Sequence, residues 1–227
     1  MKLTKEQIKQ VENYLTKKGI KYIDIRFEVL DHISTDLEYL IEHNNYSFGD
    51  AFKEVTIKWN KSFKKTSSLL LGYSSNGPKM LIKKCIKIYK PLFVKSLILV
   101  FLFIAIGYSV NYYFEYSLIN YKNVIHQFIY LALILYCGII LFWYIKIRLG
   151  KANTTFSYLF RKRIIPNLFS VFIFMPYLND SYITRENKLS VIMFAMLFVF
   201  FLTFLGARYF FKNHLKAVSN YKKYQLK

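Results

Sequence analysis

Three apolar segments, each about 20 residues long and almost free of charge, dominate the chain after residue 91. They cover roughly residues 92–113, 124–145 and 189–210. A helix of about 20 largely apolar residues crosses a hydrocarbon core of about 30 Å, where it satisfies its own backbone hydrogen bonds. The segments are too evenly apolar for amphipathic surface helices. They predict an all-α, polytopic integral membrane protein.

A fourth apolar segment, residues 164–182, is less clear because it is shorter and contains Pro166 and Pro176. It fits either a fourth span or a re-entrant hairpin. Basic side chains favour the span, because Lys and Arg accumulate in cytoplasmic loops. The only basic residue in the loop after the first segment is Lys122. The basic residues in the loop after the second segment are Lys146, Arg148, Lys151, Arg161, Lys162 and Arg163. We therefore expect four spans in a bacterial inner membrane, with the N-terminus and the basic tail, residues 211–227, in the cytoplasm.

The stretch KMLIKKCIKIYK, residues 79–90, predicts a basic amphipathic helix at the end of a linker that begins near residue 64. Pro91 is expected to break this helix before the first span. Such a helix should lie on the inner leaflet and contact anionic lipid head groups. The residues predicted to contact head groups are Lys79, Lys83, Lys87, Lys90, Arg161, Lys162 and Arg163.

The formal net charge of +20 also raises a nucleic-acid interpretation, since clustered Lys and Arg neutralise phosphates. The basic residues lie next to the apolar segments, however, and no nucleic-acid motif accompanies them. Anionic lipid explains the charge, so we expect no nucleic-acid partner.

The sequence lacks the patterns that would indicate catalysis or ion coupling. No ionisable residue lies near the middle of a predicted span, where such residues mark ion or proton paths. The motifs GxSxG and HExxH, the P-loop and the Rossmann fingerprint are all absent. Cys85 and Cys137 have neither disulfide nor metal-ligand spacing. We expect no enzyme activity and no cofactor.

Residues 1–63 predict a cytoplasmic domain of three amphipathic helices. Thr4 and Gln7 form a capping box, and Gly19 ends the first helix. A second helix is expected at about residues 22–43, and Ser47 caps a third. The predicted apolar stripes are Ile8, Val11 and Leu15; Ile23, Phe27, Leu30, Ile33, Leu37, Leu40 and Ile41; and Phe48, Phe52, Val55 and Trp59.

An acidic face on the second helix admits two interpretations. Spacings of three and four bring its side chains together as in a metal site, for which Glu28, Asp31 and His32 are weak candidates. A single helix that contributes one His is weak evidence for a metal site. We therefore expect no bound metal and a partner-binding surface instead. That predicted surface is Asp24, Glu28, Asp31, His32 and Asp36.

The runs YIDIRFEVLDHISTDLEYL and NNYSFGDAFKEV, followed by Trp59, resemble the small helical HAAS-type prefix modules of bacterial membrane proteins. The resemblance covers about residues 20–60 and rests on an acidic-then-His stretch and a small-polar, acidic, Ala pattern. Asn44 and Asn45 replace a Gly that often opens the turn. The matching residues are Glu28, Asp31 and His32, and Ser47, Asp50 and Ala51. The resemblance implies a protein-interaction or signalling module without catalytic residues.

Together these patterns favour a non-enzymatic inner-membrane protein whose residues 1–63 dock a protein partner in a regulatory, sensing or assembly role. A permease subunit or small channel is the main alternative, and a homo-oligomer is left open. An enzyme acting on lipid head groups, using the basic loop Arg161 to Arg163 with an Asp or His of the first domain, is the third hypothesis.

Overall fold

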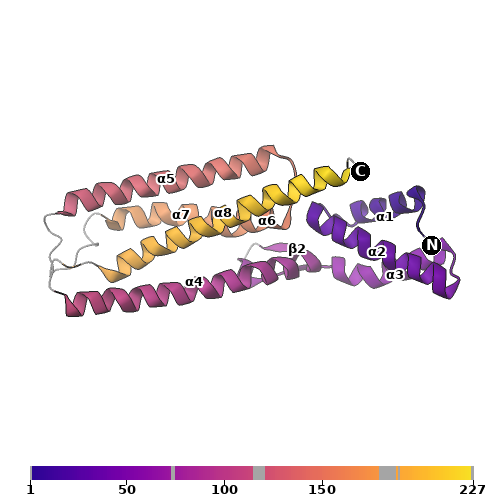
Figure 1. The fold of residues 1–227 in the computed structure, drawn as a ribbon, viewed down its shortest axis with the longest axis horizontal. Coiled ribbons are helices and arrows are strands. Elements are labelled where there is room, and N and C mark those ends of the chain that lie inside the picture. Colours follow the sequence, from indigo (N-terminus) through magenta and orange to yellow (C-terminus); the bar gives the residue numbers. More distant parts are fainter. Residues whose placement is uncertain (1, 73–74, 115–120, 179–187, 189, 226–227) are drawn as a thin grey trace. The chain divides into compact units, whose positions relative to one another are not determined.

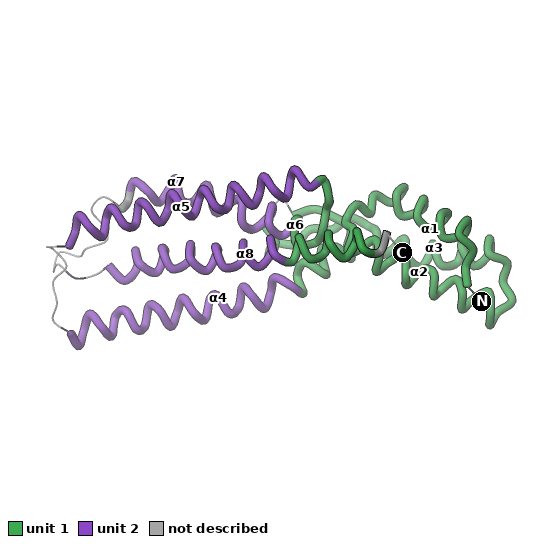
Figure 2. The backbone as a smooth tube through the Cα atoms, turned by 45° about the horizontal axis from the view of Figure 1, so that its top comes forward, with its two compact units in different colours: residues 1–87, 151–158, 213–227 green, residues 88–150, 159–212 purple. Residues whose placement is uncertain are grey.

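The computed structural model describes residues 2–72, 75–114, 121–178, 188 and 190–225. Most of these residues are helical. The chain forms two compact units, shown green and purple in Figure 2. Unit 1 contains Met1–Lys87, Lys151–Tyr158 and Asn213–Lys227, and unit 2 contains Ile88–Gly150 and Leu159–Lys212. Each unit is described separately below.

Unit 1 begins with three helices, α1 (Lys5–Lys17), α2 (Ile23–Asn44) and α3 (Phe48–Phe63), labelled in Figure 1. The predicted end signals are present. Thr4 and Gln7 form the capping box, Gly19 has a φ of 72°, and the Ser47 side chain accepts from the Asp50 N–H. Asn45 ends α2 in the left-handed conformation with a φ of 53°, a backbone geometry that Asn tolerates better than most residues.

The buried row on α2 differs from the predicted stripe. Its members repeat every fourth residue and are Ile25, Val29, Ile33 and Leu37. Only Ile33 and Leu37 belonged to the prediction. The other predicted residues flank the row and are half-buried, because α2 packs against α1 and α3 along the row while its first turns meet other segments of unit 1. Phe27, for example, has its ring 5.1 Å from the ring of Tyr221.

A short antiparallel hairpin occupies the region predicted as a linker. It consists of β1 (Lys65–Ser67), a 3-10 turn η1 (Leu69–Leu71) and β2 (Asn76–Pro78), with Lys65 opposite Pro78. The Ser75 hydroxyl donates to the Ser68 carbonyl at 2.7 Å, and Leu71 is fully buried. The hairpin is therefore an ordered element.

Helix α4 (Lys79–Tyr113) corrects two expectations about the basic segment. Pro91 lies inside the helix, so the predicted break is wrong; a proline removes only its own N–H from the helical ladder, and the turns on either side persist. The apolar side chains of Leu81, Ile82 and Cys85 are 0–2% exposed in unit 1. They pack against protein, so residues 79–90 do not form a separate helix with its apolar face free for the leaflet.

Three helices are long and apolar enough to cross a membrane, which confirms the three clear apolar segments. They are α4, α5 (Lys122–Leu149) and α8 (Val191–Gln225). The fourth segment follows a helical path without interruption from Thr155 to Leu178. It passes through α6 (Thr155–Leu159), the π-helical turn η3 (Phe160–Ile164), α7 (Ile165–Phe174) and η4 (Met175–Leu178). Residues 179–182 of this predicted span lie outside the described residues.

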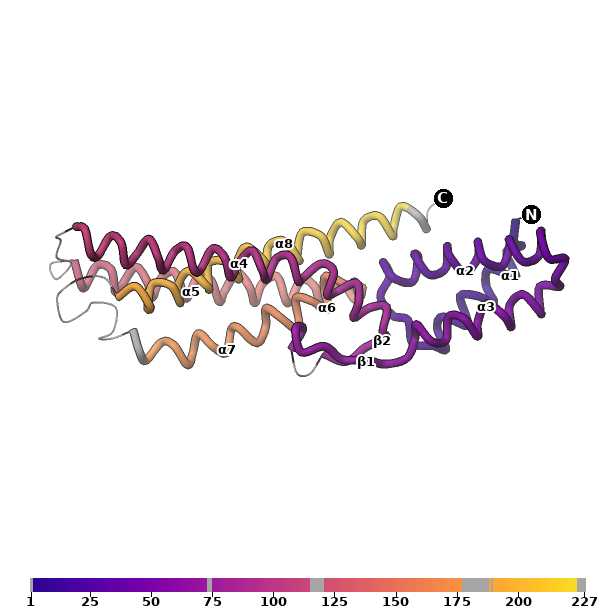
Figure 3. Tube along the Cα trace, turned by 90° about the horizontal axis from the view of Figure 1, so that it is seen from below, coloured from indigo at the N-terminus to yellow at the C-terminus, as the bar shows by residue number. Residues whose placement is uncertain are grey.

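Within unit 2, α7 runs alongside α5 and α8 (Figures 1 and 3). The Tyr130 hydroxyl of α5 donates to the Met175 carbonyl at 3.4 Å, and the Asn167 amide of α7 donates to the Thr203 hydroxyl of α8 at 3.4 Å. The start of α8 lies beside the end of α4, where the Lys188 ammonium donates to the Asn111 carbonyl at 2.8 Å.

Candidate functional site at a polar junction

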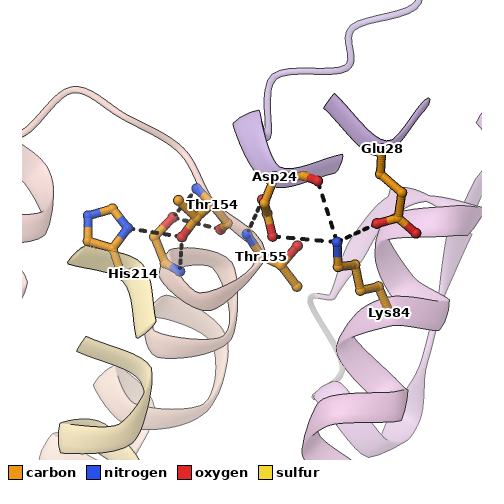
Figure 4. A network of polar contacts seen from close by, with 7 residues as sticks. Asp24, Glu28, Lys84, Thr154, Thr155 and His214 are labelled. Carbon is orange, nitrogen blue, oxygen red and sulfur yellow. Dashed lines mark hydrogen bonds and ion pairs between the residues drawn. The ribbon is translucent and has the colours of Figure 1, made fainter. Parts of the chain in front are cut away.

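A polar cluster of unit 1 joins four parts of the chain that are distant in sequence (Figure 4). We call it the polar junction. It consists of Asp24 and Glu28 of α2, Lys84 of α4, Thr154, Thr155 and Ser157 at the start of α6, and His214 of α8.

Asp24 is the central residue of the junction. Its Oδ1 accepts a hydrogen bond from the Thr155 N–H at 2.9 Å, and its Oδ2 lies 3.9 Å from the Lys84 ammonium. The side chain is only 14% exposed, and burying a polar group costs free energy unless it has partners. Within the described residues Oδ2 accepts no hydrogen bond and has only this ion pair. Because the Thr155 N–H opens α6, Asp24 satisfies a backbone group that the helix itself leaves unpaired.

Lys84 links α4 to two carboxylates of α2. Its ammonium donates to Glu28 Oε2 at 2.6 Å and to the Asp24 backbone carbonyl at 3.5 Å. The Lys84 and Glu28 side chains are 31% and 53% exposed. Ion pairs with this much solvent contact contribute about 0–1 kcal/mol, so the Lys84–Glu28 pair adds little to stability.

Thr154, Ser157 and His214 form the second half of the cluster. The Ser157 N–H donates to Thr154 Oγ1 at 3.0 Å, and His214 Nδ1 lies 2.9 Å from the same oxygen. A hydroxyl beside an imidazole can serve as a nucleophile and its base. Here Thr154 is 0% and His214 2% exposed, and the hydroxyl already accepts from Ser157. The arrangement therefore attaches α8 to the start of α6 and presents no nucleophile to a substrate.

Backbone and ring contacts extend the junction around the start of α2. The Ile23 N–H donates to the Asn153 carbonyl at 2.9 Å. The rings of Tyr22 and Tyr158 meet edge to face at 5.8 Å. The first turns of α2 are thus held by the segment that connects two apolar helices.

The remainder of the predicted acidic surface divides into two parts. Asp36 faces α3, where it accepts from the Lys58 ammonium at 2.9 Å and from Trp59 Nε1 at 3.1 Å. Asp31 and His32 stay on the exposed side of α2. Among the residues that the structure describes, no three His, Cys, Asp or Glu side chains gather to hold a metal ion.

The basic residues predicted to meet lipid also differ among themselves. Lys79, Lys83, Lys87 and Lys90 are exposed along α4. Arg161 and Lys162 are half-exposed in the π-helical turn. Arg163 instead packs on α4, with its guanidinium 4.6 Å from the Tyr89 ring centre and donating to the Tyr89 hydroxyl at 2.6 Å.

Sequence reasoning missed most of the polar junction. Lys84 does not share the helix face of Lys79, Lys83, Lys87 and Lys90. That different position could have indicated that Lys84 has a protein partner. Thr154 and Ser157 have the spacing of a helix cap, which predicts the start of α6 but not its partners. Nothing in the sequence indicated the pairing of His214 with Thr154, because their proximity depends on how the helices pack.

Comparison with protein-family models, with curated proteins and with solved structures found no match for this chain.

Proposed function

We propose that the chain is a non-enzymatic bacterial inner-membrane protein with four spans, both termini in the cytoplasm, and unit 1 as a cytoplasmic module that docks a protein partner. Docking would be communicated to the spans through the polar junction. The hydrogen bond from Thr155 to Asp24 is the observation that carries this proposal.

Chain connectivity supports an even number of crossings. Unit 1 combines residues 1–87, 151–158 and 213–227, and a compact polar unit lies on one side of a bilayer. Helices α4 and α5 provide two crossings between the first two segments. Helix α8 provides one between the last two, so residues 159–190 must provide another.

The packing of α7 in unit 2 fits that requirement. A Cβ on Gly206 of α8 would lie 4.0 Å from Ile164, at the start of α7. At the other end, Met175 receives the hydroxyl of Tyr130, which lies toward the start of α5. The helical path from Leu159 to Leu178 is also longer than the apolar stretch alone, since the turn containing Arg161, Lys162 and Arg163 extends it. Basic side chains at this end favour a cytoplasmic location for it.

The exposed side of α2 is the surface that we assign to the partner. We call it the docking face: Asp31, His32, Thr35, Tyr39 and His43. Tyr39 is 58% exposed, and its ring stacks on that of His43 at 4.4 Å. Tyrosine is frequent among residues that dominate interface energies, and Asp31 favours a partner with a basic side chain.

Helix α2 connects this docking face to the spans. Its outward residues would meet the partner, whereas Asp24 and Glu28 hold α4 and the start of α6. A displacement of α2 on docking would change those contacts, and α4 and α8 continue from unit 1 into apolar segments. A shift of this kind is sufficient for a regulatory or sensing role.

The docking face can be tested by photo-cross-linking in native membranes. A photoreactive residue replaces Tyr39 in one version of the full chain and Ile57 in another, because Ile57 of α3 is equally exposed at 59%. We expect one discrete adduct with a second protein at position 39, absent at position 57 and lost when Asp31→Lys reverses the local charge. Equal adducts at both positions, adducts with this chain alone, or persistence after Asp31→Lys would each contradict the proposal.

The transport alternative has less support. A cavity of about 750 Å³ in unit 2 lies between α5 and α8, and its walls are apolar side chains such as Phe128, Leu133 and Phe201. Such a cavity suits hydrocarbon, and Tyr136 is the one polar side chain among the residues that line it.

A further inference from the structure

The β1–β2 hairpin has an apolar tip and exposed lysines at its base. Leu69 is 87% exposed, more than any other large apolar side chain among the described residues. Leu70 beside it is half-exposed. We infer that this tip inserts into the head-group layer of an anionic lipid surface and fixes unit 1 to the membrane. The inference rests on the proposed membrane location.

The fold holds Leu69 outward. Leu71 is fully buried and fastens the turn to unit 1. The Ser75 side chain closes the turn by donating to the Ser68 carbonyl and accepting from the Ser68 N–H. Two residues apart on a 3-10 turn, Leu69 and Leu71 point in different directions. The exposure of Leu69 is therefore imposed by ordered neighbours.

No acidic residue lies near the tip along the chain, because residues 55–114 contain no Asp or Glu. The Lys79 N–H donates to the Lys64 carbonyl at 2.9 Å, which brings the two ends of the hairpin together. Exposed lysines at this base and on the next turn of α4 are Lys64, Lys65, Lys79 and Lys83. Lysines near an anionic surface are attracted to it. A lipid surface fits this combination better than a protein groove does.

Figure 3 shows the hairpin folding back beside the first turns of α4. The exposed lysines at the base of the hairpin and those on the first turns of α4 therefore belong to the same part of unit 1.

Tryptophan fluorescence in vesicles with brominated acyl chains tests the insertion. The protein has two tryptophans, Trp59 in unit 1 and Trp143 on α5. Leu69→Trp and the matched control Ile57→Trp are made in the full chain with Trp59→Phe and Trp143→Phe. A variant that retains only Trp143 reports whether α5 lies in the bilayer. All are reconstituted in phosphatidylcholine with phosphatidylglycerol and in phosphatidylcholine alone.

We expect bromine to quench position 69 several times more strongly than position 57, and only with phosphatidylglycerol present. Equal quenching at the two positions, with Trp143 quenched, would overturn the inference and leave the membrane proposal intact. An unquenched Trp143 would instead contradict the membrane proposal. Protection of position 69 from aqueous acrylamide without quenching by bromine would identify a protein occupant, and it would equally overturn lipid insertion.

Discussion

The carboxylate of Asp24 accepts a hydrogen bond from the Thr155 backbone N–H at 2.9 Å, across 131 positions of the chain. Helix N-termini leave N–H groups unpaired and favour negative charge. A residue from α2 therefore provides part of the cap of α6. This bond makes the start of α2 and the connection between two apolar helices a single structural element.

Removing the Asp24 carboxylate should destabilise unit 1. Asp24→Ala leaves the buried Thr155 N–H without its acceptor and removes the 3.9 Å ion pair with Lys84, at a cost of about 1–3 kcal/mol. Denaturation followed by Trp59 fluorescence, in a Trp143→Phe background, reports unit 1. The stability of Asp24→Asn should lie between that of the parent protein and that of Asp24→Ala, because an amide oxygen can still accept from the Thr155 N–H. Asp31→Ala, on the exposed side of α2, is the control, and equal losses for Asp24→Ala and Asp31→Ala would show that the junction contributes nothing.

Tyr14 should make unit 1 less stable at alkaline pH. Its hydroxyl donates toward the Thr56 carbonyl and Asn60 Oδ1, at 3.2 and 3.1 Å, and burial raises its pKa above the usual value. Its contribution to stability is complete below the unfolded pKa of about 10 and declines as pH rises toward the higher folded pKa.

Tyr14→Phe removes both the hydrogen bonds and the titration. We expect a loss of about 1 kcal/mol at neutral pH and a smaller decline in stability from pH 9 to 11 than the parent shows. Unfolding followed by Trp59 fluorescence at several pH values measures both. Tyr39→Phe on the exposed face is the matched substitution, and an unchanged alkaline slope in Tyr14→Phe would refute the assignment.

Two glycines of the apolar helices should respond differently to the same substitution. A Cβ on Gly107 of α4 would lie 2.8 Å from a methyl group of Val191 at the start of α8, whereas a Cβ on Gly138 of α5 would have nothing within 4 Å. Gly107→Ala must displace α8 locally, and overpacking of this kind costs about 1–3 kcal/mol.

The comparison is made in detergent or vesicles, using Trp143 fluorescence in a Trp59→Phe background. Gly138→Ala controls for the better helix propensity of alanine. We expect Gly107→Ala to lower the unfolding temperature relative to Gly138→Ala. Equal temperatures would mean that α4 and α8 do not approach closely at Gly107.

Four membrane crossings predict which introduced cysteines a membrane-impermeant reagent can reach from outside the cell. A membrane-impermeant maleimide added to intact cells should label Phe114→Cys and Lys188→Cys, and should label Arg148→Cys and Ser219→Cys only after lysis. The parent protein, with Cys85 buried and Cys137 half-buried, provides the blank. Labelling of Phe114→Cys without Lys188→Cys would leave residues 159–190 on the cytoplasmic side and contradict the fourth span.

Local signals determined several features correctly from the sequence. Capping boxes, positive-φ glycines and apolar length depend on residues within one or two turns, so Thr4, Gly19, Ser47 and the three long apolar helices were predictable. The interpretation of Pro91 failed for a related reason. A proline weakens a helix by a fixed local amount, but whether the helix continues depends on the packing of its flanking turns.

Tertiary packing alone decided what the charged residues do. The sequence predicted one acidic surface containing Asp24, Glu28 and Asp36. In the folded protein Asp24 and Glu28 form ion pairs with Lys84, and Asp36 forms one with Lys58. It also paired Thr154 with His214 across 60 positions. Helical periodicity defines which side chains share a face, but burying a charge requires a partner from another segment, and only the arrangement of segments in space supplies it.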